Sequence, residues 1–349
     1  GVTACLGVLL MIISKTVLLP AVLAHLKLEE GAKVAPVYDA NGRNPRWWTL
    51  SALSEPRPAL ITLVIALVVL AGGTALSRGL LTGDVGTGAP ELRAESRYNQ
   101  DNDNIIAHYS IGMDVLSVYA ETQNVEEACV DWSVMNAVER FQARMSRVDG
   151  VQSVTTSAAL AKIAAAGNNE GNPRWAALQR TEAALRSGIK VLVPDLGLNT
   201  ESCKLINMQI FLKDHEGATL THVVNEVKKF IAEDKTPTVK FLLGGGNAGV
   251  AAATNEAVEH AEVQMLASIF GAITLLCWLT FRSWRAVLCI IVPLAIVSIL
   301  CNALMAVLGI GLKVPTLPVI ALGVGVGVDY GIYLFESMQH ALRDRHTTA

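Results

Sequence analysis

Five apolar stretches, each long enough or nearly long enough to cross a lipid bilayer, constrain this chain more than any other feature. A helix needs about 20 apolar residues to span the roughly 30 Å hydrocarbon core of a membrane. The stretches are residues 2–24, 59–76, 263–281, 286–308 and 316–335. Hydrophobic residues make up 52% of the chain and charged residues only 17%, a charge content lower than that of an ordinary soluble protein. The sequence therefore predicts a bundle of five transmembrane helices.

Between the second and third stretches lie about 180 more polar residues, which is the size of a complete domain. Runs rich in β-forming residues predict strands at 113–120, 151–156, 205–212 and 239–243. Helical spacing of apolar residues predicts one helix after Asp131, its expected N-cap, and another from Leu220 to Ile231. Two β-α-β units in tandem predict an inserted α+β domain of the ferredoxin-like, split β-α-β type. Alanine-rich segments at 158–166 and 174–186 predict a helical insertion between its halves.

Lys and Arg residues predict the orientation in the membrane, because they are enriched in cytoplasmic loops. They concentrate in the linker after the first span, at Arg282 and Arg285, and in the tail, so these three loops are expected in the cytoplasm and the large domain outside it. The predicted segments are a transmembrane helix (1–26), a cytoplasmic linker (27–58), a transmembrane helix (59–78), the extracytoplasmic α+β domain (79–258), three transmembrane helices (259–338) and a cytoplasmic tail (339–349). A short helix starting at Arg46 fits either an interfacial helix or a partly buried linker helix.

Six cysteines are present, and four of them lie in apolar spans, where cysteine acts as a small hydrophobic residue. Only Cys129 and Cys203 lie in the large domain. If that domain faces an oxidising compartment, these two are expected to form a disulfide. Two buried free thiols are the alternative.

Asp329 is the residue most suited to carry chemistry, because it lies about thirteen residues, or roughly 20 Å, inside the last apolar stretch. An ionised carboxylate at that depth costs about 3 kcal/mol on insertion scales. Protonation removes the charge, so Asp329 is expected to bind and release a proton as transport proceeds. The alternative is a permanent pairing of Asp329 with a lysine or a helix-terminal amide.

Residues around Asp329 support the same hypothesis. Gly323, Gly327 and Gly331 recur every four residues and predict close approach of a neighbouring helix, and Gly325 leaves the carboxylate uncrowded. Tyr330 is expected either to extend a proton relay or simply to pack. Lys15 is a second intramembrane charge, which either reaches the membrane edge or pairs with a carboxylate.

Several other functions lack support in the sequence. The net charge of −3 gives no reason to expect nucleic acid. No Cys/His spacing resembles a metal site, and the run from Gly244 to Asn247 lacks the Lys-Ser/Thr pair of a phosphate-binding loop. The seven histidines are scattered outside the spans. No enzymatic activity, cofactor or metal is therefore predicted.

The run from Ala321 to Tyr333 (ALGVGVGVDYGIY) resembles the tenth transmembrane helix of resistance-nodulation-division (RND) transporters. It is most similar to the branch of hopanoid exporters and mycobacterial membrane-protein-large (MMPL) lipid transporters, and the segments 148–154 and 247–255 resemble the outer domain of that branch. The resemblance implies twelve helices in two halves, with this chain covering helices six to ten and the second porter domain. It also implies a proton relay in which Asp329 and Tyr330 work with a fourth-helix acid that lies outside this chain.

The resemblance implies proton-driven export of hydrophobic or lipid-like molecules, with the porter domain in the periplasm and the helices in the bacterial inner membrane. The expected partners are membrane lipids, a hydrophobic substrate, protons, the remaining helices of the transporter and a homo-oligomeric copy. Two alternatives remain: a lipid- or sterol-sensing membrane protein that does not transport, and a proton-driven accessory of protein secretion. Retained ligand binding without proton flux would favour the first, and co-purification with a translocon the second.

Overall fold

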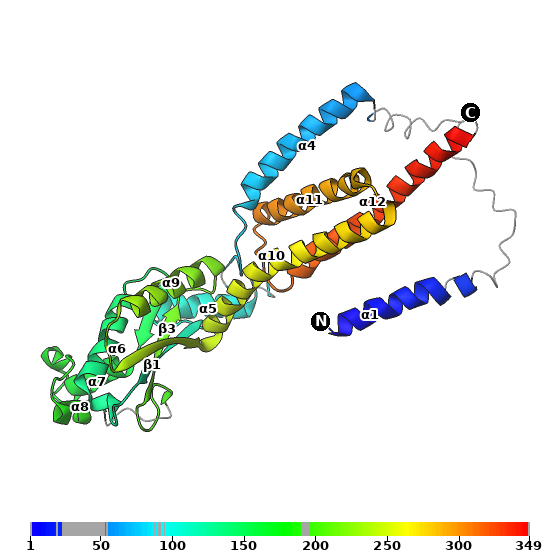
Figure 1. Cartoon of the computed structure of the whole chain (residues 1–349). Coiled ribbons are helices and arrows are strands. Elements are labelled where there is room, and N and C mark those ends of the chain that lie inside the picture. The colour runs from blue at the N-terminus through cyan, green and yellow to red at the C-terminus, as the bar shows by residue number, and fades with distance from the viewer. Residues whose placement is uncertain are drawn as a thin grey trace. The chain divides into compact units, whose positions relative to one another are not determined.

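The computed structural model describes residues 2–18, 20–22, 53, 55–86, 88–89, 92–93, 95–189 and 196–347. The chain divides into two compact units, Gly1–Val68 and Val69–Ala349, and the helix α4 (Pro56–Ser77) crosses the boundary between them. The first unit also contains α1 (Val2–Ile13), which continues into the π-helical segment η1 (Ser14–Leu18). Every other element of the described residues lies after Val68 and so belongs to the second unit, and the order of the elements can be followed in Figure 1.

Four helices among the described residues are long and apolar enough to cross a membrane. They are α4, α10 (Gly246–Phe281), α11 (Trp284–Val307) and α12 (Leu317–Thr347), whose candidate span is Leu317–His340. They coincide with the second to fifth apolar stretches, so the membrane-protein class is confirmed. The helix α1 is not one of the four, and a fifth span at residues 2–24 stays a prediction. The predicted helix at Arg46 and the side chain of Lys15 lie outside the part that the structure describes.

A four-stranded antiparallel sheet forms the centre of the domain between α4 and α10. Its strands are β1 (Val115–Thr122), β2 (Val151–Thr155), β3 (Leu205–Leu212) and β4 (Val239–Gly245), in the order β2-β3-β1-β4. All four fall within two residues of the strands predicted from the sequence. Because β3 lies between β1 and β2, those two strands do not pair with each other, although they are consecutive in the sequence.

Two helices pack against the sheet and close the main hydrophobic core. They are α6 (Trp132–Met145) and α9 (Gly217–Glu233), and each buries one apolar stripe. Asp131 caps α6 as predicted, because its carboxylate accepts a hydrogen bond of 3.0 Å from the backbone N–H of Val134. Phe141, Phe230 and Phe241 meet in the core with ring centroids 5.2–5.8 Å apart, so both helices and β4 share one aromatic cluster.

The insertion between β2 and β3 is helical, but less regular than predicted. It contains α7 (Ser157–Gly167), the short 3-10 helix η4 (Pro173–Trp175) and α8 (Glu182–Ile189). Within residues 174–186 the helical conformation is interrupted between η4 and α8. Between η4 and α8, Leu178 is buried in the core and Arg180 lies over the ring of Trp132 at 5.4 Å, so tertiary contacts override helix propensity there.

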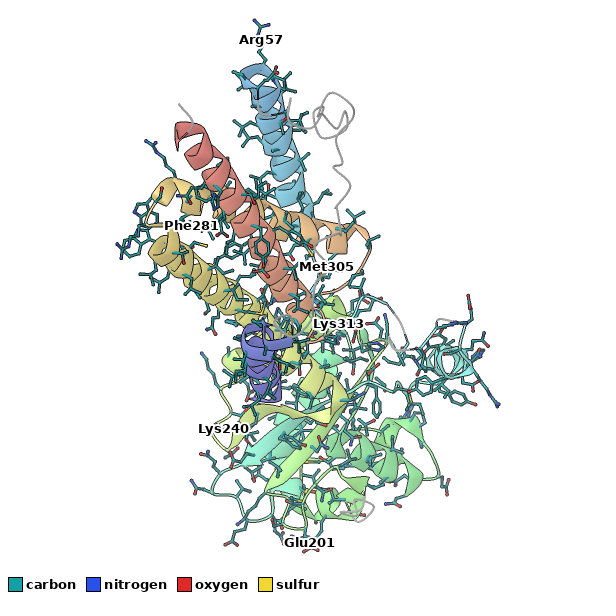
Figure 2. The ribbon with its side chains drawn as sticks, turned by 90° about the vertical axis from the view of Figure 1, so that its right-hand side faces the viewer. Arg57, Glu201, Lys240, Phe281, Met305 and Lys313 are labelled. Carbon is teal, nitrogen blue, oxygen red and sulfur yellow. A yellow bond between two sulfur atoms is a disulfide. The ribbon has the colours of Figure 1, made fainter. Side chains whose placement is uncertain are left out.

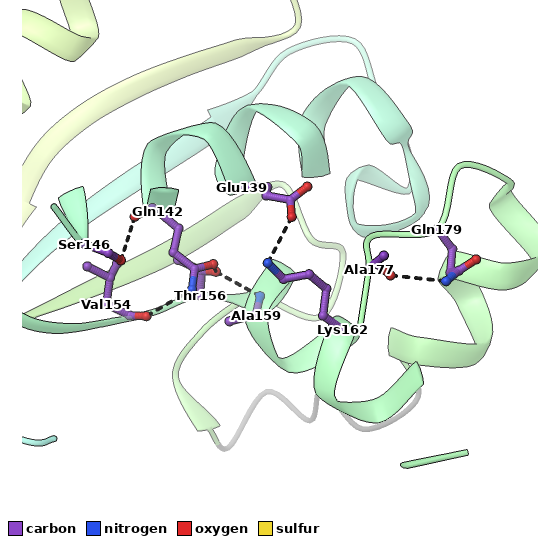
Figure 3. A network of polar contacts seen from close by, with 9 residues as sticks. All are labelled: Glu139, Gln142, Ser146, Val154, Thr156, Ala159, Lys162, Ala177 and Gln179. Carbon is purple, nitrogen blue, oxygen red and sulfur yellow. Dashed lines mark hydrogen bonds and ion pairs between the residues drawn. The ribbon is translucent and has the colours of Figure 1, made fainter. Parts of the chain in front are cut away.

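A polar network fastens this insertion to α6 (Figure 3). Lys162 on α7 donates a hydrogen bond of 2.9 Å to Glu139 on α6. Thr156 donates to Gln142 Oε1 at 2.9 Å and accepts a hydrogen bond from the N–H of Ala159 at 3.1 Å, which caps α7.

Two further short helices flank the sheet, α5 (Arg97–His108) before β1 and the 3-10 helix η3 (Ala128–Val130) before α6. Cys129 in η3 and Cys203, which precedes β3, form a disulfide across a sequence separation of 74 residues. Of the two alternatives that the sequence left open for these cysteines, the structure contains the disulfide.

Candidate functional site

Asp329 lies on α12, about 18 Å along the helix from Leu317 and so near the middle of the candidate span. Its side chain is exposed on the surface of the chain rather than covered by α10 or α11. Among the described residues, no ion pair or hydrogen bond engages its carboxylate. A permanent partner for Asp329 is therefore not found in the described part of the chain.

The two faces of α12 explain this placement. One face packs on the neighbouring helices through Ile320, Val324 and Val328, of which the first two are 2% exposed. The other face carries exposed apolar side chains and Asp329. These apolar side chains are Val319, Leu322, Val326, Tyr330 and Tyr333. Asp329 thus belongs to an apolar face that the described bundle leaves uncovered.

Tyr330 does not hydrogen-bond to Asp329 within the described residues. Adjacent residues on a helix do not face each other, so direct donation from Tyr330 to this carboxylate is disfavoured. Tyr330 instead lines an apolar cavity of about 490 Å³ between α11 and α12. Pro293, Leu294 and Leu334 are among the other residues that line this cavity.

The four glycines beside Asp329 divide into two pairs. A Cβ added to Gly327 would lie 2.7 Å from Leu294 Cδ1, and one added to Gly331 would lie 3.2 Å from Ile290 Cγ2. A Cβ at Gly323 or Gly325 would have nothing within 4 Å among the described residues. The close approach predicted for Gly327 and Gly331 is present, whereas for Gly323 it stays a prediction. A spacing of four residues advances about 40° around a helix of 3.6 residues per turn, so Gly323 lies about 80° from Gly331 around α12, and it is exposed.

The sheet continues directly through β4 into α10, one of the candidate membrane-spanning helices (Figure 1). Gly246 starts α10 with a φ of +79°, and a Cβ there would lie 2.0 Å from the carbonyl oxygen of Val115. Asn247 Oδ1 accepts a hydrogen bond of 2.7 Å from the N–H of Val115. The glycine run therefore ends a strand and begins the long helix.

A second connection joins the domain to the loop between α11 and α12, in which Lys313 lies (Figure 2). The N–H of Leu312 donates to the carbonyl of Leu81, and the N–H of Gly83 donates back to the carbonyl of Leu312, both at 2.8 Å. Lys313 Nζ lies 2.6 Å from Asp84 Oδ1. Because both charged side chains are about one third exposed, this ion pair contributes at most about 1 kcal/mol.

His215 lies at the turn between β3 and α9, close to both connections, and no sequence motif indicates its role. Its Nδ1 lies 3.2 Å from Asp114 Oδ2, and Asp114 Oδ1 accepts a hydrogen bond of 2.9 Å from Asn247. The hydrogen bond to Asp114 raises the pKa of His215 above its ordinary value, against the opposing effect of burial. Asp114 and His215 are 101 residues apart, so no local motif could have revealed the pair.

Within the described residues, no group of three or more His, Cys, Asp or Glu side chains could hold a metal ion. Comparison with known protein families gives a match. A model of the MMPL family matches residues 117–349, which is well over half of the chain. No match was found among curated proteins. The matched region contains the sheet, α10, α11 and α12 with Asp329. The chain therefore belongs to the MMPL family and is a multi-pass membrane protein.

Proposed function

We propose that this chain is part of a proton-driven transporter that exports hydrophobic or lipid-like molecules from the bacterial inner membrane. The single observation that carries the proposal is the position of Asp329, halfway along an apolar helix and on a face that α10 and α11 leave uncovered. Family membership supports a transporter rather than an enzyme.

The free-energy cost of an ionised Asp329 in the membrane would couple proton binding to a change in helix arrangement. An ionised carboxylate in mid-membrane costs about 3 kcal/mol on insertion scales, whereas the protonated form carries no charge. A helix arrangement that exposes Asp329 to water favours release of the proton, and one that encloses it in an apolar environment favours uptake. Proton occupancy therefore biases the equilibrium between two arrangements of α12.

The uncovered face of α12 supports the view that further helices complete the site. In an RND-type arrangement, a fourth-helix acid from the remaining part of the transporter would face Asp329 there. Proton transfer between the two acids would then need no group on α10 or α11. A homo-oligomeric copy is a further expected partner.

We assign the domain to the ferredoxin-like class, because its strand order and its two packed helices match a split β-α-β sandwich. We place it, at residues 79–258, in the periplasm. The disulfide between Cys129 and Cys203 supports that side of the membrane, because disulfides persist in oxidising compartments. The sheet domain is connected to the membrane helices through the β4–α10 junction and through the α11–α12 loop. These two connections would transmit movements of α10 and of that loop to the sheet.

The apolar cavity between α11 and α12 supports a hydrophobic substrate or lipid. Its volume of about 490 Å³ falls within the range of ligand sites, and its walls come mainly from apolar side chains. Tyr330 lies in this wall, one residue from Asp329, so the cavity and the proton site share one turn of helix.

The test is the efflux of a hydrophobic fluorescent probe, N-phenyl-1-naphthylamine, from energised cells that produce the full-length protein. Asp329→Asn removes the titratable group with little change in size, and efflux is expected to fall to the level of cells treated with a protonophore. Glu336→Gln, on the same helix seven residues later, is the matched control and is expected to keep efflux. Wild-type efflux by a normally expressed Asp329→Asn protein would refute the assignment.

A further inference from the structure

The turn between α10 and α11 carries a group of charged and aromatic side chains. The helix α10 ends at Phe281, which is labelled in Figure 2, and α11 begins at Trp284. Arg282 and Ser283 therefore form the whole connection between two helices that are each long and apolar enough to cross a membrane. When both helices cross the bilayer, so short a connection must lie where the hydrocarbon core meets water.

Two tryptophans flank this turn and are not covered by the described helices. Trp278 is 40% exposed and Trp284 is 63% exposed, and their ring centroids lie 6.3 Å apart. Neither indole N–H has a hydrogen-bond partner among the described residues. Exposed tryptophans favour the boundary of a membrane, where the ring contacts lipid and the N–H donates to a headgroup. The pair therefore indicates that the turn lies at the level of the headgroups.

Two arginines lie in the same turn. Arg282 and Arg285 are exposed, and neither forms an ion pair or a side-chain hydrogen bond within the part of the chain that the structure describes. On α12, the ring of Phe335 packs on that of Phe281 at 5.0 Å, and Glu336 follows it without pairing with either arginine. Two positive charges beside the tryptophan pair are therefore left without a counterion from these residues.

The backbone of Arg282 is a further observation. This residue ends α10 in the left-handed region, with a φ of +48° and a ψ of +29°. Glycine is the usual residue in this conformation at the end of a helix, because a Cβ is sterically disfavoured there. An arginine at this position therefore places its charge at the turn at a steric cost that glycine would avoid.

We propose that the α10–α11 turn binds the headgroup of an anionic phospholipid. The guanidinium groups of Arg282 and Arg285 contact the phosphate, to which each can donate two parallel hydrogen bonds. The rings of Trp278 and Trp284 lie against the start of the acyl chains. A zwitterionic lipid has the same phosphate but also carries a cation that the arginines repel, so the net negative charge selects the lipid.

This lipid site goes beyond the proposed transport, because it uses neither Asp329 nor the apolar cavity between α11 and α12. Its occupant is a resident lipid of the bilayer rather than an exported molecule. A lipid bound there contacts the ends of both α10 and α11, and Phe281 links this end of the bundle to α12.

The test uses the full-length protein in phosphatidylcholine vesicles that contain brominated phosphatidylglycerol or, separately, brominated phosphatidylcholine. Bromine on an acyl chain quenches the fluorescence of a tryptophan that it contacts. The signal of Trp284 is the difference between each protein and the same protein carrying Trp284→Phe. The dependence of quenching on lipid composition gives the relative affinity of the turn for the two lipids, and the wild-type protein is expected to prefer phosphatidylglycerol.

The double variant Arg282→Gln, Arg285→Gln is expected to lower this preference by about 25-fold, or about fivefold for each arginine. Arg282→Gly alone is expected to lower it by about fivefold. Because glycine relieves the left-handed backbone, this variant is expected to fold at least as stably as the wild-type protein, so its loss of preference does not come from misfolding.

The matched control is Arg147→Gln, Arg174→Gln, which removes the same charge from two exposed, unpaired positions of the sheet domain. This control is expected to retain the wild-type preference. Equal quenching by the two lipids in the wild-type protein, or an unchanged preference in the Arg282 and Arg285 variants, would overturn the proposal. Loss of the preference in sodium phosphate but not in sodium chloride of equal ionic strength would also overturn it, because the turn would then bind free phosphate.

Discussion

Leu294 Cδ1 on α11 lies 2.7 Å from the point that a Cβ of Gly327 on α12 would occupy. One turn away, Ile290 approaches Gly331 in the same manner. The absence of side chains at these two glycines therefore sets the distance between α11 and α12, and with it the position of Asp329 two residues beyond Gly327. Small residues at such contacts are typical of helix packing in membranes.

Gly327→Leu is expected to destabilise the α11–α12 contact by about 1–3 kcal/mol, because a larger side chain must displace Leu294. Gly323→Leu is the matched control, since a Cβ at Gly323 would meet no atom within 4 Å among the described residues. The measurement is the melting temperature of both variants in detergent micelles. Equal losses for the two variants would contradict the assigned contact.

The disulfide between Cys129 and Cys203 is expected to stabilise the sheet domain by about 4 kcal/mol, since it closes a long loop in the unfolded chain. Replacing both cysteines by alanine should therefore raise the hydrogen-exchange rates of the β1 and β3 amides. Cys289→Ala, which removes a free thiol from α11, is expected to leave those rates unchanged. Unchanged exchange in the double variant would show that the disulfide does not hold these strands.

The pair of His215 and Asp114 predicts a pH dependence of stability. Because the hydrogen bond to Asp114 raises the pKa of His215 in the folded state, the folded protein binds this proton more tightly than the unfolded chain does. The stabilisation is fully present below the unfolded value of about 6.5 and is lost as the pH rises through the higher folded value. Unfolding measurements between about pH 6 and pH 8 should therefore show a loss of stability at the alkaline end.

His215→Gln is expected to remove that part of the pH dependence. His222→Gln, an exposed position on α9, is the matched control and should retain the wild-type profile. If the two variants gave the same profile as the wild-type protein, the pair would not be the source of the pH dependence.

Most of the fold could be predicted because its signals are local. Runs rich in β-forming residues located β1 and β3, and the helical spacing from Val134 to Met145 located α6 with Asp131 as its cap. The break between η4 and α8 could not be predicted, because Leu178 and Arg180 leave the helical conformation for contacts with distant parts of the domain. Tertiary packing overrides propensity in such segments.

The candidate site was predicted in part. Asp329 could be identified as a candidate functional residue because a carboxylate in an apolar stretch is rare. The helical repeat rotates Gly323 away from Gly327 around α12. Whether that rotation takes Gly323 out of contact depends on the position of α11, which the sequence alone does not reveal. The pair of Asp114 and His215 could not be predicted, because contacts between residues 101 positions apart carry no local signal.

Proton flux through the reconstituted transporter tests the central claim most directly. Full-length protein in liposomes would be given an inward pH gradient, and an entrapped pH-sensitive dye would report proton entry in the wild-type protein, Asp329→Asn and Glu336→Gln. Substrate-dependent flux is expected in the wild-type protein and Glu336→Gln, and is expected to fall to the protein-free rate in Asp329→Asn. Wild-type flux in correctly folded Asp329→Asn would contradict the account.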